Sequence, residues 1–192
     1  MTMWFDPGCP FTWRTSRWLR ATAADRGDDI TWRLMSLAAL REGSDEEVPE
    51  PYKGIGERAR LATRVLAAVA DRYGNDGLDR AYTAFGTRNH DQGRDYGPDL
   101  FREALAEAGL PAELADAAGD TSLDATVRAS HDEGQKRVGQ DSGSPVLAAG
   151  DGPGFFGPVL TGIPTGDEAQ RLYDAFLALS AVPEFSELKR AR

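Results

Sequence analysis

The sequence predicts an α/β fold in which an all-helical segment interrupts the α/β layer. Residues 1–40 alternate strand, helix and strand, residues 49–119 show helical periodicity alone, and residues 120–192 return to helix, two strands and helix. A chain of 192 residues suits one such domain with an inserted lobe. We therefore expect an α/β domain made of residues 1–48 and 120–192, with residues 49–119 forming an inserted helical domain.

The first predicted unit is a strand, a helix and a second strand. Met3–Phe5 is apolar and is followed by the turn-forming run Asp6–Gly8. Pro10 suits the first position of a helix, because its missing N–H would have no partner there. Helical spacing continues to about Arg26, and residues 30–35 then have the composition of a strand.

The inserted segment is predicted from its apolar spacing. Leu61 and Val65 begin a series of apolar residues that lie on one face of a helix. Pro98 suits the first turn of a further helix, and Gly109 suits its end. Pro111 opens a short helix after it, so we expect helices alone between the two halves of the α/β layer.

Two capping boxes and two short strands predict the last part of the chain. Thr121 and Thr165 each precede an acidic residue by three positions, which predicts a helix after each of them. Gly139 predicts the end of the first of these helices. Residues 146–149 and 155–156 are apolar and flank a Gly-rich turn, so we expect a β-hairpin there.

Charge and composition narrow the possible partners. The chain has 22 Lys and Arg against 31 Asp and Glu, a formal charge of −9, which argues against nucleic acid as a partner. Its apolar runs are shorter than the roughly 18 residues that a membrane span needs, so we expect no membrane partner. The N-terminus has no signal-peptide pattern and the chain has 1 cysteine, which together favour a cytoplasmic location.

Cys9 is the sharpest chemical feature of the sequence. If Pro10 is the first helical residue, Cys9 is the N-cap, and its sulfur faces the free N–H groups of Phe11 and Thr12 at the positive end of the helix. We therefore expect a partly exposed thiol whose pKa lies below the ordinary value of about 8.5. The alternative is a small buried hydrophobic residue. A single cysteine excludes an internal disulfide in either case.

Several motifs carry a resemblance to a known family. Cys9-Pro10-Phe11-Thr12 together with Ser144-Pro145 resembles the Cys-Pro-x-Cys motif and cis-proline of the thioredoxin fold, and the helical insertion resembles its DsbA-like branch. Further motifs from Trp4 to Arg190 resemble the actinobacterial mycothiol-dependent nitroreductases; they are Trp4–Pro10, Thr15–Trp18, Met35–Ala38, Gly86–Gly93, Phe155–Leu160 and Glu187–Arg190. The resemblance implies a thioredoxin-like fold with an inserted all-helical domain and a thiol-dependent oxidoreductase.

Thr12 departs from that family, which has a second cysteine at this position. The resemblance then implies a monothiol cycle, in which Cys9 attacks the substrate and a small thiol such as mycothiol resolves the product. We expect the Thr12 hydroxyl to donate to the Cys9 thiolate, with both residues catalytic. The alternative for Thr12 is neutral drift after loss of activity. The small thiol is expected as a co-substrate, with no tightly bound cofactor.

The Ser144–Pro145 bond is expected to be cis and to lie beside Cys9. This expectation comes from the resemblance, because only about 5–6 % of X-Pro bonds in folded proteins are cis. The strand that follows, residues 146–149, has to enter the sheet next to the site. We therefore expect Ser144 and Pro145 to line the cleft that binds the substrate.

The remaining predicted binding residues surround the same helix start. Pro10, Phe11 and Trp13 lie close to the sulfur and are expected to shape an apolar pocket. His90 belongs to one of the family motifs, so a role in the site and a purely structural role both stay open. His131 falls within an apolar helical stripe, so we expect it to pack in the core.

Other functions stay open or are excluded. Gly152–Gly157 matches the dinucleotide motif G-x-G-x-x-G, but Pro158 follows directly and no helix can begin there. Two histidines and one thiol give no metal-ligand spacing, so we expect no metal site. The alternatives to the oxidoreductase are a thiol S-transferase or isomerase resembling the kappa-class glutathione transferases, and a catalytically silent thiol- or substrate-binding module.

Overall fold

The structure is a computed structural model that describes residues 1–42, 54–139 and 142–191. Within these residues a four-stranded sheet has the order β2-β1-β3-β4. Its strands are β1 (Thr2–Phe5), β2 (Thr31–Leu34), β3 (Val146–Ala148) and β4 (Gly154–Phe156). β1 runs parallel to β2, and β3 runs antiparallel to both β1 and β4. The predicted start of the chain and the predicted hairpin are both confirmed.

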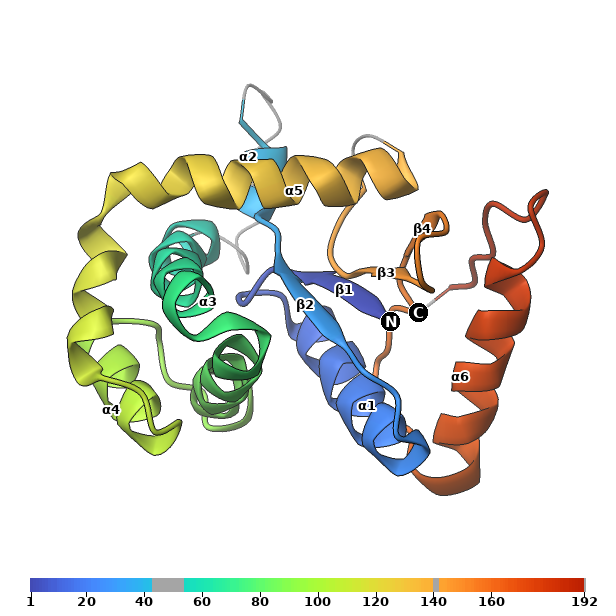
Figure 1. Ribbon diagram of the computed structural model, residues 1–192, viewed down its shortest axis with the longest axis horizontal. Coiled ribbons are helices and arrows are strands. Elements are labelled where there is room, and N and C mark those ends of the chain that lie inside the picture. The colour runs from blue at the N-terminus through green and yellow to red at the C-terminus, as the bar shows by residue number, and fades with distance from the viewer. Residues whose placement is uncertain (43–53, 140–141, 192) are drawn as a thin grey trace.

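Helices lie on both faces of this sheet (Figure 1). α5 (Asp124–Val138) crosses one face, and α1 (Pro10–Arg26) and α6 (Gly166–Ser180) lie on the other. α1 and α6 are joined by a hydrogen bond of 3.0 Å from the indole N–H of Trp18 to the carbonyl of Ala169. The sheet, including the end of β1 that leads to Cys9, therefore lies between two helical layers.

Alternation of side chains along β1 explains the two layers. Met3 and Phe5 point into the apolar core that includes α1 and α6, whereas Trp4 points to the opposite face, into a smaller cluster with Met35. Gly134 of α5 allows this packing, because a Cβ at that position would lie 2.9 Å from the indole ring of Trp4.

The described residues between β2 and β3 form helices and no strand, as predicted for the inserted segment. The elements are α2 (Leu37–Leu40), which was not predicted, α3 (Ile55–Gly86), the π-helical turn η2 (Thr87–Asp91), α4 (Pro98–Glu107), and the 3₁₀ helices η3 (Ala112–Gly119) and η4 (Thr121–Leu123), followed by α5. α3 is kinked at Gly74, whose φ of 62° and ψ of −157° are not helical. The residues predicted to begin the insertion, 49–53, lie outside the described residues.

One apolar core runs from the sheet into these helices. The same buried cluster contains Met3 and Phe5 of β1, Phe85 of α3, and Phe101 and Leu105 of α4. The Phe85 and Phe101 rings stack with their centroids 5.2 Å apart. The helices thus pack on the sheet layer through apolar side chains. A division of the chain into two domains at 48/49 and 119/120 remains a prediction from the sequence.

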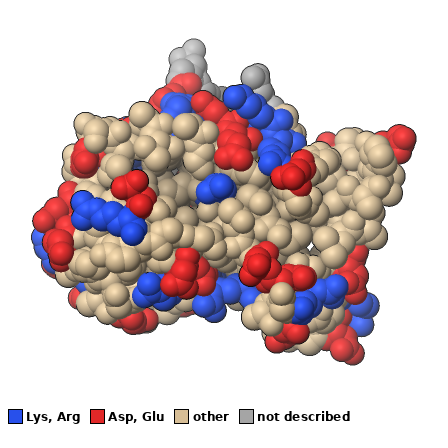
Figure 2. All heavy atoms as spheres, viewed as in Figure 1, with Lys and Arg blue, Asp and Glu red and all other residues tan. Residues whose placement is uncertain are grey.

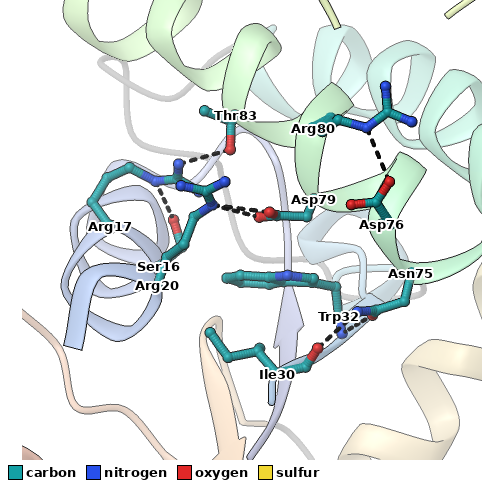
Figure 3. Close-up of polar contacts among 10 residues, drawn as sticks. All are labelled: Ser16, Arg17, Arg20, Ile30, Trp32, Asn75, Asp76, Asp79, Arg80 and Thr83. Carbon is teal, nitrogen blue, oxygen red and sulfur yellow. Dashed lines mark hydrogen bonds and ion pairs between the residues drawn. The ribbon is translucent and has the colours of Figure 1, made fainter. Parts of the chain in front are cut away.

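Polar contacts hold the second half of α3 against the edge of the sheet (Figure 3). Asn75, directly after the kink, accepts from the N–H of Trp32 at 2.7 Å and donates to the carbonyl of Ile30 at 2.8 Å. Arg20 of α1 forms an ion pair with Asp79 at 2.9 Å. Asn75 therefore binds one backbone group of the edge strand β2 and one of the residue just before it.

The two predicted capping boxes are wrong in detail. Asp120, not Thr121, caps the first turn, because its Oδ1 accepts from the N–H of Ser122 at 3.0 Å. That turn is the 3₁₀ helix η4, and α5 follows it without a side-chain cap. Thr165 is the N-cap of α6, but its side chain makes no capping hydrogen bond. The predicted helices exist, and Gly139 ends α5 as expected.

Charges of both signs share the surface. On the face shown in Figure 2, acidic side chains lie beside basic ones and wide areas carry neither. Arg88 and Glu107, for example, form an ion pair of 2.7 Å. Among the helices of the described residues, none is both long and apolar enough to cross a membrane.

Candidate active site

Cys9 stands at the junction of β1 and α1. The turn Asp6–Gly8 links the two elements, and it is closed by a 3.2 Å hydrogen bond from the Cys9 N–H to the Asp6 carbonyl. Cys9 has extended backbone angles, φ −85° and ψ 115°, and is the N-cap of α1, with Pro10 as the first helical residue. The predicted position of the thiol at the start of a helix is confirmed.

The thiol is more buried than the sequence predicts. Cys9 is 7 % exposed, and its S–H donates to the carbonyl of Ser144 at 3.6 Å. Burial raises the pKa of Cys9; hydrogen bonds from the Thr12 hydroxyl and from the Thr12 and Phe11 amides lower it, and the nearby Asp6 carboxyl raises it. The prediction of a partly exposed thiol with a depressed pKa is therefore wrong, because desolvation outweighs the donors at the helix start.

The cis-proline prediction is confirmed. The Ser144–Pro145 peptide bond is cis, and the Ser144 carbonyl lies against the Cys9 sulfur. Ser144 and Pro145 are both buried. The Ser144 hydroxyl lies 2.8 Å from the hydroxyl of Thr12, whose side chain is fully buried, and it accepts from the Asp6 N–H at 2.9 Å. In the structure the Ser144 side chain thus contacts other buried groups of the protein, namely the Asp6 N–H and the Thr12 hydroxyl.

His90 and Trp13 form the side of the site that faces the helical segment. The Nε2 atom of His90 donates to the carbonyl of Pro7 at 2.8 Å, and the imidazole stacks on the Trp13 ring with centroids 5.7 Å apart. The hydroxyl of Tyr96 donates to the same Pro7 carbonyl at 2.8 Å. Burial lowers the pKa of His90, which favours the neutral ring. His90 therefore holds the turn that precedes Cys9.

Trp13 is fixed by a close approach of α1 to α3. Its indole N–H donates to Asp91 at 2.9 Å, and the guanidinium of Arg17 lies 4.2 Å from its ring centroid. Gly86 leaves the space for the ring, since a Cβ there would lie 2.1 Å from the nearest Trp13 atom. Trp13 is therefore held from two sides, and its 3 % exposure makes it part of the inner wall of the site.

The predicted site residues all gather around the start of α1. Pro10 and Phe11 are half-buried, with the Arg14 guanidinium 5.6 Å from the Phe11 ring centroid. His131 is elsewhere: it is buried on α5, where its Nδ1 accepts from the N–H of Ser36 at 3.4 Å. Its predicted place in the core is confirmed.

Three residues of this environment were not predicted as site residues. The buried Asp6 carboxyl accepts from the N–H groups of Gly8 and Leu37, each at 2.7 Å, and burial raises its pKa. The Asp6–Gly8 turn is a local signal for the first of these bonds. Asp91 and Tyr96, which contact Trp13 and Pro7, come from η2 and the loop after it, and nothing in their own sequence indicates those partners.

The groups around Cys9 suit thiol–disulfide exchange by a single sulfur atom. A thiol with hydroxyl and amide donors beside it can form and break a single disulfide with an external partner. Within residues 1–42, 54–139 and 142–191 there is no group of three or more His, Cys, Asp or Glu that could hold a metal ion.

Two solved structures resemble this chain over most of their length. A protein provisionally described as a protein disulfide isomerase from Nitrosomonas europaea gives a TM-score of 0.59 at 12 % identity, covering 92 % of this chain and 97 % of that one. A second, from Pseudomonas syringae and described in the same way, gives 0.50 at 21 % identity, covering 91 % and 90 %. These likenesses show the fold, which is the thioredoxin-like α/β fold with DsbA-like helical content.

Sequence comparison shows the family. Rv2286c, an uncharacterised protein of Mycobacterium tuberculosis, is 32 % identical over 190 residues, covering 98 % of this chain and 80 % of that protein. The Rv2466c-like family model, described as mycothiol-dependent nitroreductase Rv2466c, matches residues 8–190. Because that match includes Cys9, the helical segment and the hairpin, the chain belongs to the Rv2466c-like family of mycothiol-dependent nitroreductases.

Proposed function

We propose that this protein is a monothiol oxidoreductase of the cytoplasm, with Cys9 as its nucleophile and mycothiol or a similar small thiol as co-substrate. The observation that carries the proposal is the pairing of Cys9 with Thr12 at the start of α1. Thr12 stands one helical turn on, its hydroxyl lowers the pKa of Cys9, and the chain has 1 cysteine. The resolving thiol therefore has to come from another molecule.

The proposed cycle has two exchange steps. The Cys9 thiolate attacks one sulfur of a substrate disulfide, which forms a mixed disulfide with Cys9 and releases the other half of the substrate as a thiolate. The thiolate of the small thiol then attacks the substrate sulfur of that mixed disulfide. Cys9 leaves as a thiolate, and the product is a disulfide between the small thiol and the substrate half.

The neighbouring residues have separate tasks in this proposal. The Thr12 hydroxyl and the amides of Phe11 and Thr12 stabilise the attacking and leaving thiolate, because each donates toward the sulfur. The half-buried Pro10 and Phe11 supply apolar surface for the substrate, and the buried Trp13 ring supports it from inside. His90 orients the Cys9 turn through the Pro7 carbonyl.

The second part of the proposed substrate-binding site is the Ser144–Pro145 segment, whose backbone lies against the sulfur. The cytoplasmic location follows from the co-substrate, because a small-thiol reductant stays reduced in a reducing compartment. No metal ion or tightly bound cofactor takes part in the proposed cycle.

One observation favours a second candidate. Cys9 is buried and burial raises its pKa, which makes its sulfur a poorer nucleophile at neutral pH. In a thiol S-transferase or isomerase, the start of α1 would instead activate the sulfur of a bound small thiol, and Cys9 would be dispensable. A silent binding module would keep the same cleft without turnover.

Turnover of Cys9→Ser separates these functions. Wild-type protein is supplied with a small-molecule disulfide and mycothiol, and release of substrate thiol is followed with and without the mycothiol. The proposal expects turnover that requires the added thiol and disappears in Cys9→Ser. Full turnover in Cys9→Ser would favour the transferase, and no turnover in the wild type with any small thiol would favour the binding module. A thermal melt checks that the variant is folded.

A further inference from the structure

Two buried hydroxyl groups next to Cys9, those of Ser144 and Thr12, are hydrogen-bonded to each other and to the turn before Cys9. The backbone N–H of Asp6 donates to the Ser144 hydroxyl oxygen at 2.9 Å, and that oxygen lies 2.8 Å from the Thr12 hydroxyl oxygen. Thr12 lies one helical turn after Cys9, and its hydroxyl lowers the pKa of the thiol. Ser144 is 5 % exposed and Thr12 is fully buried, so solvent does not compete for these groups.

The protons available allow a direction of donation that ends at the sulfur. A hydroxyl has one proton to donate and can accept two hydrogen bonds. The backbone N–H of Asp6 can only donate, so it fixes the Ser144 oxygen as an acceptor. Ser144 then has its own proton free for Thr12. If Thr12 accepts that proton, its single proton is left for the sulfur, and successive donors in one direction strengthen one another.

We propose that Ser144 is a positioning residue that acts on Cys9 through Thr12. Its hydroxyl donates to the Thr12 oxygen and thereby turns the Thr12 proton toward the sulfur, which stabilises the thiolate. This inference rests on the proposed function and deepens it. The Ser144 and Thr12 hydroxyls would stabilise the Cys9 thiolate in a chain that has no second cysteine to do so.

The protonated form of Cys9 contacts a different group of Ser144. While Cys9 is protonated, its S–H donates to the carbonyl of Ser144, so the sulfur does not need the Thr12 proton. Loss of the thiol proton to solvent ends that bond and makes the sulfur an acceptor. Ser144 therefore contacts the thiol through its backbone and supports the thiolate through its side chain.

A double-mutant cycle on the pKa of Cys9 tests the proposal. The variants are Thr12→Val, Ser144→Ala and the double variant, and the thiolate is followed by its ultraviolet absorbance against pH, with Cys9→Ser as the blank. We expect Thr12→Val to raise the pKa of Cys9 by about one unit, a tenfold loss of thiolate at neutral pH. We expect Ser144→Ala to raise it by a smaller amount in the wild type and by nothing further when Thr12 is already Val.

The controls separate positioning from general damage. Thr22→Val removes another buried hydroxyl from α1, where it has no hydrogen-bond partner, and should leave the pKa of Cys9 unchanged. Ser144→Thr keeps a hydroxyl and should restore a pKa near that of the wild type. It also serves as the second variant if Ser144→Ala does not fold.

Two results would overturn the proposal. An equal shift for Ser144→Ala with and without the Thr12 hydroxyl would show that Ser144 acts on the sulfur directly. No shift for Ser144→Ala in the wild type would show that its hydroxyl does not act at all. Because the titration needs no turnover, failure of the proposed oxidoreductase activity would be seen separately and would leave this result standing.

Discussion

At the scale of single residues, the chemistry of Cys9 depends on two opposed effects. Its N-cap position supplies amide and hydroxyl donors that favour the thiolate, while its burial favours the thiol. Burial is the larger effect, and the Asp6 carboxyl adds to it. The hydroxyl of Thr12 is the largest contribution in the other direction.

The first prediction is that Cys9 titrates above the ordinary cysteine value. Alkylation by iodoacetamide should rise with pH and reach its midpoint above about 8.5, because the raised pKa of the folded protein delays formation of the thiolate. The rate is measured by loss of the free thiol across the pH range, with urea-unfolded protein as the matched reference. A midpoint in the folded protein below that of the unfolded one would contradict this balance of effects.

The second prediction uses the position of Thr12. One turn of helix separates it from Cys9, and such pairs fall within the Cα separation of about 4.4–6.8 Å that disulfides tolerate. Thr12→Cys should therefore oxidise to an intramolecular disulfide without unfolding. Thiol titration and a thermal melt measure both parts, with Thr12→Ser as the control. Two thiols that stay free under oxidising conditions would mean that the two side chains do not meet.

At the scale of elements, the site depends on the close packing of α1 against α3 and η2. Trp13 of α1 bonds to Asp91 of η2 and stacks on His90, and the ring passes directly over Gly86. The side of the site that faces the helices is therefore built by contact between elements far apart in the sequence.

The third prediction tests this contact. Gly86→Ala should destabilise the protein by about 1–3 kcal/mol, the usual range for overpacking, because the new Cβ would lie 2.1 Å from Trp13. Urea unfolding measures the change. Gly119→Ala is the matched control, since a Cβ there meets nothing within 4 Å. A Gly86→Ala variant as stable as the wild type would show that the ring can move away at little cost.

Local signals in the sequence explain which elements could be predicted. The start of α1 at Pro10 and its N-cap Cys9 are encoded by adjacent residues, so both were predictable. The capping box at Thr121 failed because Asp120, one residue earlier, caps the turn there, and the one at Thr165 failed because the Thr165 side chain makes no capping hydrogen bond. The burial of Cys9 depends on Ser144, which no local pattern brings beside it.

At the scale of the whole molecule, the helices and the sheet layer share one apolar core and a charged link. Arg64 of α3 is buried and binds Asp124, the first residue of α5, through two hydrogen bonds of 2.7 Å. Its guanidinium also donates to the carbonyl of Ala118 at 3.2 Å. The link joins the helical segment to the helix that crosses the sheet.

The fourth prediction concerns this link. The hydrogen bonds from Arg64 lower the pKa of Asp124, so its contribution to stability is present above the ordinary value of about 3.9 and is lost as the pH falls. Asp124→Asn should cost about 1 kcal/mol at pH 7, a small value because the Asp124 side chain is 43 % exposed. The deficit, measured by urea unfolding, should shrink toward pH 3.

Asp116→Asn is the control for the fourth prediction. It breaks the 3.3 Å pair with Arg102, both of whose side chains are more than half exposed, and should change stability little. An Asp124→Asn deficit that is equal at neutral and acid pH would mean that the charge of Asp124 does not contribute.

Intact-mass spectrometry shows directly whether Cys9 carries the substrate as a mixed disulfide that a small thiol resolves. Wild-type protein and Cys9→Ser are incubated with mycothiol disulfide, quenched with acid and weighed, and the wild-type sample is then treated with free mycothiol. We expect one mycothiol adduct on the wild type, none on Cys9→Ser, and loss of the adduct when free thiol is added. An unmodified wild-type protein at every ratio of disulfide would contradict this mechanism.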